Sequence, residues 1–311
     1  MDVFRTSDER FENLPGYAFT PRYLDVDGLA DTALRMHYVD EGSPHADPVV
    51  LFHGEPTWSF LYRKLIPPLA AAGHRVIAPD YLGFGRSDKP QSLDWYTYDR
   101  HVESMLRLLE VLDLRRITAV VQDWGGPIGL RLATENPERF ARLVILNTAI
   151  MSGENRMPEA WWTFRNFVDR VKPDIPIAML VERACHTSPS PEVMRGYDAP
   201  FPEAAAKWGA AAFPLIVPTS TETPGAAAAA ETGRRLRAWR KPALVCFSDN
   251  DPIFSPRVGE RLAERIPGAL RPMTVVREAG HFLQEDKGEE IAEHINGFLA
   301  TAIEQSPSTS V

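Results

Sequence analysis

Cysteine is scarce in this sequence, and long hydrophobic runs are missing. Only Cys185 and Cys246 occur among the 311 residues, far apart and in apolar surroundings. This usage does not indicate a disulfide framework, and free, buried thiols are expected. No run of about eighteen apolar residues, the length that crosses a bilayer, is present. The first residues are polar and acidic and lack the features of a secretory signal, so we expect a cytoplasmic protein with no membrane partner.

Positive charge is also in short supply. The chain has 34 Lys and Arg residues against 42 Asp and Glu residues, a formal net charge of -8. A polyphosphate partner requires clustered positive charge, so no nucleic-acid partner is expected. One short basic cluster, at Arg234, Arg235, Arg237 and Arg240, is typical of a solvated helix face. No coiled-coil heptads occur, and a monomer is the default expectation.

The remaining composition is that of a globular protein, with 44% hydrophobic and 24% charged residues, and the length suits one large domain with an inserted subdomain. Apolar residues at helical spacing between Asp99 and Leu112, and again after Asp123, predict helices. Short apolar, β-branched runs predict buried strands. These runs are Val49–Phe52, Val76–Ala78, Ile117–Val121, Leu143–Leu146, Leu244–Phe247 and Met273–Val276. Strands that alternate with helices indicate a doubly wound, mostly parallel sheet.

The alternation of strands and helices stops after Asn147 and resumes near Lys241. The stretch between them is rich in Trp, Pro and Ala, with helix-like pieces and no clear strand. Its alanine run, Ala226–Ala230, continues at helical spacing and predicts an ordinary helix. We therefore expect an α/β core domain formed by residues 1–149 and 241–311, and a helical cap at residues 150–240.

The most informative segment is Val120–Gly126, where an apolar strand ends in a polar residue and glycines open a helix. This is the layout of a nucleophile elbow, the strand-to-helix turn that exposes the nucleophile in α/β-hydrolases. The nucleophile position holds Asp123 rather than serine. A carboxylate can attack a saturated carbon and form an ester, which suits displacement of a halide or opening of an epoxide. The alternative is that Asp123 only caps the helix that follows.

A second segment, His53–Trp58, directly follows an apolar run. A glycine-containing turn at this place can point a backbone N–H inward, and in α/β-hydrolases it supplies half of an oxyanion hole. The donors would be the N–H groups of Glu55 and Trp124, facing the charge that develops when water attacks an ester. His53 itself is interpreted as structural.

Two later strand ends supply an acid and a histidine. Phe247–Pro252 carries Asp249 and Asp251, and Glu278–Phe282 carries His281. The order nucleophile, acid, histidine is that of α/β-hydrolases, in which the acid orients the imidazole and stabilises its protonated form. Either acid could instead serve as a turn residue. We favour Asp251 as the partner of the histidine, with Asp249 as an exposed turn residue.

Taken together, the segments HGEPTW, APDYLGFGRSDKP, VVQDWGG, DNDP and AGHFLQED resemble the haloalkane dehalogenases, and the resemblance covers nearly the whole chain. It implies an α/β-hydrolase fold with a cap and a triad of Asp123, His281 and Asp251. It matches the subfamily whose acid follows the strand after the cap. The sister subfamily places its acid where this chain has Leu146–Thr148, and no carboxylate stands there.

Members of this family hold the departing halide with two tryptophan indoles, which donate hydrogen bonds without competing as acceptors. By the resemblance, Trp124 is the first halide-binding residue. The second lies in the segment Pro158–Phe164. We assign Trp162, with Trp161 and the position of Phe164 as alternatives.

The resemblance implies that a haloalkane is hydrolysed to an alcohol, a halide ion and a proton through an alkyl ester on Asp123. The partners would be a small uncharged halogenated alkane and water. No cofactor or metal is expected. Carboxylate, imidazole and indole groups supply what each step of the reaction needs, and no His or Cys cluster has metal-ligand spacing. The alternative is an epoxide hydrolase with the same nucleophile. It would need acidic cap tyrosines, and the expected cap contains only Tyr197.

Overall fold

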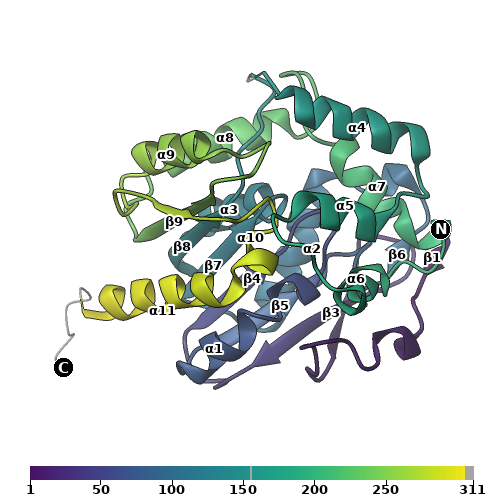
Figure 1. Ribbon diagram of the computed structural model, residues 1–311, viewed down its shortest axis with the longest axis horizontal. Coiled ribbons are helices and arrows are strands. Elements are labelled where there is room, and N and C mark those ends of the chain that lie inside the picture. Colours follow the sequence, from purple (N-terminus) through teal and green to yellow (C-terminus); the bar gives the residue numbers. More distant parts are fainter. Residues whose placement is uncertain (155, 305–311) are drawn as a thin grey trace.

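The computed structural model describes residues 1–154 and 156–304. At their centre lies an eight-stranded sheet with the order β10-β9-β8-β7-β4-β5-β3-β2 (Figure 1). Neighbours from β10 to β5 pair in parallel, whereas β3 pairs antiparallel with both β5 and β2. The strands of this sheet are β2 (Arg22–Val26), β3 (Leu34–Glu41), β4 (Pro48–Phe52), β5 (Arg75–Pro79), β7 (Ile117–Gln122), β8 (Phe140–Leu146), β9 (Ala243–Ser248) and β10 (Thr274–Val276). A separate antiparallel pair joins β1 (Val3–Phe4) to β6 (Lys89–Pro90).

The six runs that the sequence marks as strands are all present, as β4, β5, β7, β8, β9 and β10. The prediction of a mostly parallel α/β sheet is therefore confirmed. The antiparallel strands β2 and β3 are not predicted from the sequence. In β2 the residues are mostly exposed or half-buried, because it lies at the edge of the sheet, so its few apolar residues form no continuous run.

Alternate residues of the central strands face two separate buried clusters. In β4, Val49 and Leu51 belong to one cluster, and Val50 and Phe52 belong to the other. The first cluster contains side chains of α1 (Ile66–Ala71) and α11 (Gly288–Glu304), and the second contains side chains of α2 (Tyr98–Val111), α3 (Gly125–Glu135) and α9 (Pro256–Arg265). Helices thus cover both faces of the sheet, which explains why its central strands β4 and β7 are buried along their whole length.

Shorter helices connect these elements. They are the 3-10 helices η1 (Asp8–Phe11), η2 (Ser59–Tyr62), η3 (Leu93–Trp95) and η4 (Ala204–Lys207), and the short α10 (Leu283–Asp286). The helix predicted from Asp99 to Leu112 is α2, which begins one residue earlier. Its N-cap is Thr97, whose hydroxyl accepts a hydrogen bond from the N–H of Arg100 at 3.2 Å, so the side chain satisfies one of the free N–H groups of the first turn.

Between β8 and β9 the described residues contain helices and no strand, as expected for the cap. These helices are α4 (Glu159–Val171), α5 (Ile177–Ala184), α6 (Pro191–Asp198), α7 (Trp208–Leu215) and α8 (Ala226–Leu236). Helix α4 contacts α7, and α5 contacts α6 (Figure 1). The alanine run forms α8 as predicted, but α8 contacts α3 of the core. The boundaries of the cap at residues 150 and 240 stay a prediction.

Other features of the sequence can be placed in the same structure. Cys185 is half-buried and Cys246 is buried, and both are free. The basic cluster is exposed, and two of its members, Arg234 and Arg235, pair with Glu231 on α8. In residues 1–154 and 156–304, no helix combines the length and the low polarity that a membrane crossing requires.

Candidate active site

Asp123 occupies the turn between β7 and α3. Its φ is 50°, a left-handed conformation that a residue with a side chain adopts only under strong local constraint. Gly125 allows the close turn, because a Cβ at this position would overlap the carbonyl oxygen of Phe52. The N-cap residue of α3 is Trp124, not Asp123. The turn therefore has the geometry of a nucleophile elbow, and the carboxylate is left available for other contacts.

Two backbone N–H groups face this carboxylate. The N–H of Glu55, in the turn after β4, donates to Oδ1 of Asp123 at 2.8 Å. The N–H of Trp124, the next residue, lies near the same carboxylate and lowers its pKa. The structure thus brings together the two donors predicted from the sequence. If the carboxylate carried an ester, these N–H groups would face its carbonyl oxygen, as an oxyanion hole requires.

His281 and Asp251 lie beside the elbow. His281 stands in the loop between β10 and α10, and its Nδ1 lies 2.8 Å from Oδ2 of Asp251. Its Nε2 lies 3.6 Å from Oδ2 of Asp123. The other oxygen of Asp251 accepts hydrogen bonds from the backbone N–H groups of Ile253 and Phe254. Asp249 makes no contact with the imidazole; it is 23% exposed and bonds to Asn250 and Ala279. The geometry thus selects Asp251.

Burial and neighbouring charges shift the pKa values of all three side chains. Burial raises the pKa of Asp251, but the charge and hydrogen bond of His281 outweigh it, so this pKa lies below its usual value. Burial lowers the pKa of His281, but Asp251 and Asp123 together raise it above its usual value. Burial raises the pKa of Asp123 despite the opposing effect of His281 and the two N–H groups. The Asp251 carboxylate therefore stabilises a protonated imidazole, as the acid of a triad does.

Two further polar residues hold the loop that carries His281. The side-chain amide of Asn147, at the end of β8, donates to the carbonyl oxygens of Gly280 and His281. The amide of Gln122, the last residue of β7, lies 3.2 Å from both Nε2 and the carbonyl oxygen of His281. Sequence reasoning assigned no role to either amide. In the sequence, each is recognisable only as a polar residue at the end of an otherwise apolar strand.

His53 is structural, as interpreted from the sequence. It is fully buried behind the turn that carries Glu55. Its Nδ1 lies 3.0 Å from the carbonyl oxygen of Gly54, and its Nε2 accepts a hydrogen bond from the N–H of Tyr81. Burial lowers the pKa of His53 to about 4, so its imidazole is neutral at pH 7 and can accept that bond.

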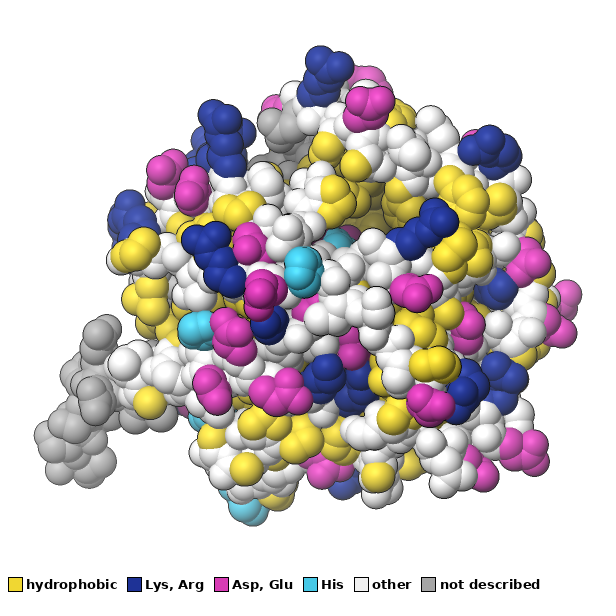
Figure 2. All heavy atoms as spheres, in the orientation of Figure 1, with side chains coloured by type: hydrophobic (Ala, Val, Ile, Leu, Met, Phe, Trp, Pro, Cys, Tyr) yellow, Lys and Arg dark blue, Asp and Glu magenta, His cyan; other side chains and the backbone are white. Residues whose placement is uncertain are grey.

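A cavity of about 250 Å³ lies between the elbow and the cap helices. Asp123, His281, Trp124 and Glu55 supply polar groups to it, while most of the other lining side chains are apolar. The cap contributes Met157, Trp161, Phe164, Leu180, Arg183 and Val217, among others. Figure 2 shows a hollow in the upper half of the molecule, with hydrophobic side chains in its depth. A small apolar molecule would be shielded from water here while its reacting atom faces the carboxylate.

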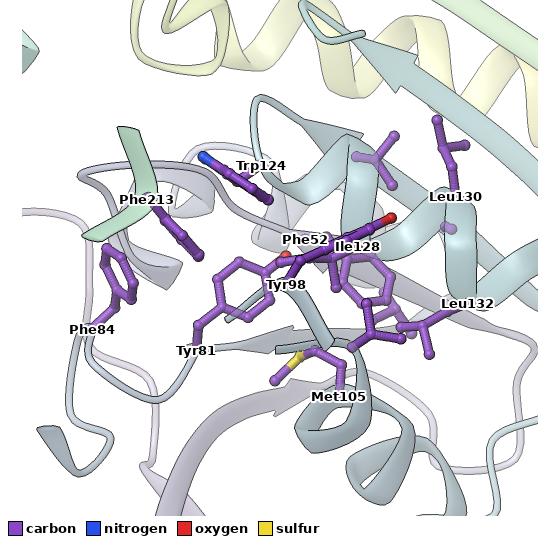
Figure 3. Packing of buried hydrophobic residues seen from close by; sticks show 14 of the residues in the cluster. Phe52, Tyr81, Phe84, Tyr98, Met105, Trp124, Ile128, Leu130, Leu132 and Phe213 are labelled. Carbon is purple, nitrogen blue, oxygen red and sulfur yellow. The ribbon is translucent and has the colours of Figure 1, made fainter. Parts of the chain in front are cut away.

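Trp124 lies at the cavity as predicted, but the second tryptophan at the cavity is Trp161 and not Trp162. The indole of Trp124 lines the cavity and stacks on Phe213, with ring centroids 4.8 Å apart (Figure 3). Trp162, the assigned second halide residue, is 38% exposed and does not line the cavity. Trp161 is 5% exposed and lines it, as does Phe164. The two alternative positions thus line the cavity and Trp162 does not, because adjacent residues of a helix point in directions about 100° apart.

The chain is similar to haloalkane dehalogenases over nearly all of its length. The haloalkane dehalogenase of Psychrobacter cryohalolentis is 46% identical over 301 residues, which cover 96% of this chain and 98% of the relative. Haloalkane dehalogenase 1 of Mycobacterium tuberculosis is 49% identical over 296 residues, which cover 95% of this chain and 98% of the relative. A family model described as alpha/beta hydrolase fold matches residues 47–183. The chain belongs to the haloalkane dehalogenases.

A solved structure of another haloalkane dehalogenase has the same fold. DpaA from Paraglaciecola agarilytica is 37% identical, with a TM-score of 0.88 over 94% of this chain and 97% of that chain. The family and the α/β-hydrolase fold predicted from the sequence are thereby confirmed. DpaA is tetrameric, so the monomer expected for the present haloalkane dehalogenase stays a prediction.

The epoxide hydrolase alternative is not favoured for this dehalogenase. Tyr197, the tyrosine considered as an acid for epoxide opening, is fully buried and does not line the cavity. Its hydroxyl donates to Glu285 at 2.6 Å. Tyr98 lines the cavity, but its hydroxyl donates to the carbonyl oxygen of Pro127 at 2.8 Å. Among the described residues, no group of three or more His, Cys, Asp or Glu side chains is arranged to hold a metal ion.

Proposed function

We propose that this haloalkane dehalogenase converts small uncharged haloalkanes to alcohol, halide and a proton through a covalent ester on Asp123. The observation that carries the proposal is the contact set of the Asp123 carboxylate. One oxygen, Oδ1, accepts from the Glu55 N–H, while Oδ2 lies 3.6 Å from Nε2 of His281. The carboxylate therefore has one oxygen held by backbone donors and one that faces both the cavity and the base.

In the first step, Oδ2 attacks the carbon that bears the halogen. A bond forms between this oxygen and the carbon as the carbon–halogen bond breaks, and the halide leaves with the electron pair. Two indole N–H groups, of Trp124 and Trp161, would donate to the departing halide. The indoles of Trp58 and Trp95 donate to backbone carbonyl oxygens. Within the described residues no such acceptor is seen for Trp124 or Trp161, so their N–H groups can serve the halide.

In the second step, His281 removes a proton from water, and the water oxygen attacks the ester carbonyl carbon. The charge that develops on Oδ1 meets the N–H groups of Glu55 and Trp124. Asp251 orients the imidazole and stabilises its protonated form. The ester bond then breaks, the alcohol leaves, the carboxylate is restored, and one proton passes to solvent. Each step uses side chains that already lie within the site.

Halide and proton release from small substrates tests this proposal. We expect the purified protein to release bromide from 1-bromobutane or 1,2-dibromoethane, together with one proton for each bromide, and to leave styrene oxide unchanged. Asp123→Ala removes the nucleophile and should abolish bromide release while the protein remains folded. The proposal is overturned if none of these bromoalkanes releases bromide, or if Asp123→Ala is as active as the parent.

Two finer expectations accompany the proposal. We expect a cytoplasmic enzyme that is active as a monomer, although the related DpaA is tetrameric. Light scattering coupled to size-exclusion chromatography measures the mass directly. A mass of one chain that retains bromide release supports a complete active site in each subunit, whereas activity found only in a larger assembly contradicts it.

A further inference from the structure

The amide of Gln122 approaches His281 on the side of the imidazole that must accept a proton. Gln122 is fully buried, and its Nε2 lies 3.2 Å from Nε2 of His281. The other imidazole nitrogen, Nδ1, is 2.8 Å from the carboxylate of Asp251. Because an ionised carboxylate only accepts hydrogen bonds, Nδ1 carries a proton, and in the neutral imidazole Nε2 then presents its lone pair. An amide N–H can donate to that lone pair.

A second contact fixes which end of the Gln122 amide faces the imidazole. Its Nε2 also lies 3.2 Å from the carbonyl oxygen of His281, an acceptor that also receives the amide of Asn147. A reversed amide would place Oε1 of Gln122 against this carbonyl oxygen, which would bring two acceptors together. In the observed orientation the NH2 group of Gln122 faces His281, and Oε1 of Gln122 is buried and has no hydrogen-bond partner among the described residues.

A donor at Nε2 stabilises the neutral imidazole and opposes protonation, since the imidazolium would carry its own N–H there. The charged groups near His281 act in the other direction. Asp251 and Asp123 both favour the imidazolium and raise the pKa of His281. Glu55 and Arg183 line the same cavity. Burial holds the pKa of Glu55 well above its usual value and so favours its neutral form. The Gln122 amide therefore lowers the pKa of His281, whereas the carboxylates of Asp251 and Asp123 raise it.

We propose that Gln122 is a positioning residue that keeps His281 in its neutral form, so that Nε2 is unprotonated and can exchange its amide donor for a water molecule whose proton it takes. The proposal rests on the function proposed above, since it concerns the base of the second step. It assigns Gln122 no part in displacement of the halide. Gln122 acts only on hydrolysis of the ester. By lowering the pKa of His281, it extends hydrolysis to lower pH.

The direct test is the pH dependence of ester hydrolysis in Gln122→Met and Gln122→Glu. Met is similar in size and lacks the donor, and Glu places an acceptor where the amide stood. Hydrolysis requires neutral His281 and therefore rises with pH through the pKa of that residue. Loss of one hydrogen bond corresponds to about one pKa unit. We expect this pKa to rise by about one pH unit in Gln122→Met, and by more in Gln122→Glu.

Rapid mixing with 1,2-dibromoethane separates the two steps. The burst of bromide reports displacement, and intact mass after quenching reports decay of the ester. In Gln122→Met we expect the burst to stay within about threefold of the parent, while ester decay is about tenfold slower below the shifted pKa and recovers at high pH. A merely structural role would slow both steps at every pH. Gln284→Met is the matched control, because Gln284 is equally buried and follows His281 closely in the chain; we expect no shift.

A measurement on the parent protein does not depend on the folding of any variant. Nitrogen-15 NMR of labelled histidines at pH 8 should show His281 with a protonated Nδ1 and an unprotonated, hydrogen-bonded Nε2. A proton on Nε2 in this state would overturn the proposal. So would an unchanged pKa of ester hydrolysis in both Gln122 variants while their bromide burst persists. Absence of a burst and of an ester in the parent would instead defeat the proposed function itself.

Discussion

Gly54 packs directly against the side chain of Asp123. A Cβ at position 54 would overlap the Cβ, Cγ and Oδ1 atoms of Asp123. Gly54 also immediately precedes Glu55, whose N–H donates to Oδ1. The two turns after β4 and β7 thus meet with no space between them. This contact fixes the carboxylate relative to its backbone donors.

The first prediction is that Gly54→Ala inactivates the enzyme far more than it unfolds it. The added methyl group must displace Asp123 or the Glu55 turn, and a shift of about 1 Å in a catalytic group can cost about a hundredfold in rate. We expect kcat/KM for 1,2-dibromoethane to fall at least that much. Gly297→Ala is the control, because nothing lies within 4 Å of its added Cβ. A Gly54→Ala enzyme with activity within twofold of the parent would show that the contact is not required.

The second prediction separates the adjacent cap tryptophans. Trp161→Phe removes a donor that lines the cavity, whereas Trp162→Phe changes an exposed side chain. A hydrogen bond to a charged group contributes about 1.5–3 kcal/mol. We therefore expect Trp161→Phe to weaken product inhibition by bromide at least tenfold, and Trp162→Phe to change it less than twofold. Equal effects of the two substitutions, or a larger effect at Trp162, would contradict the assignment of Trp161.

The sequence predicts most of the site because its residues follow strand ends, where motifs are local. Asp123 and Trp124 are recognisable from seven consecutive residues. Asp251 and His281 follow the ends of the adjacent parallel strands β9 and β10, which places their loops side by side. The cap is different. Whether position 161 or 162 faces the cavity depends on the rotation of α4 about its axis, which the packing of the cap decides. Local sequence does not contain that information.

The same limit applies to the polar groups behind the site. Gln122 is visible as a residue of the elbow motif, but its contact with His281 joins positions 159 residues apart. The unpredicted strands β2 and β3 have different causes. The edge strand β2 buries too few residues to show a continuous apolar run, whereas β3 is mostly buried but polar residues interrupt its apolar ones. Strands with continuous apolar runs are predictable from the sequence, and long-range polar contacts are not.

The third prediction concerns a buried ion pair of the core, Arg63 with Glu285, to which Tyr197 of α6 also bonds. Arg63 donates two hydrogen bonds to Glu285, at 2.6 and 2.7 Å, and the hydroxyl of Tyr197 donates a third. Glu285 is 4% exposed. Removal of one partner of a buried pair typically costs about 3–5 kcal/mol, so we expect Glu285→Gln to lower the free energy of unfolding at pH 7 by about that amount. Glu110→Gln, in an exposed pair with Arg107, should change it by less than about 1 kcal/mol.

The pH dependence of this stabilisation has a definite sign. Burial raises the pKa of Glu285, but Arg63 and Tyr197 outweigh it, so the pKa in the folded state lies below that in the unfolded state. The contribution is therefore fully present above the unfolded value, about 4.3, and is lost as the pH falls through the folded value. Urea unfolding at pH 7 and at pH 3 should show a smaller difference between parent and Glu285→Gln at the lower pH. A difference that grows on acidification would contradict this sign.

The central claim, a covalent ester on Asp123 that His281 resolves, is tested most directly with His281→Phe. The substitution keeps a flat ring in the loop and removes the base, so displacement can proceed while hydrolysis cannot. After mixing with 1,2-dibromoethane, we predict one equivalent of bromide per enzyme and a gain in intact mass of one bromoethyl group, located on the peptide that contains Asp123. Continued turnover of His281→Phe, or a burst of bromide with no mass gain on that peptide, would contradict the account.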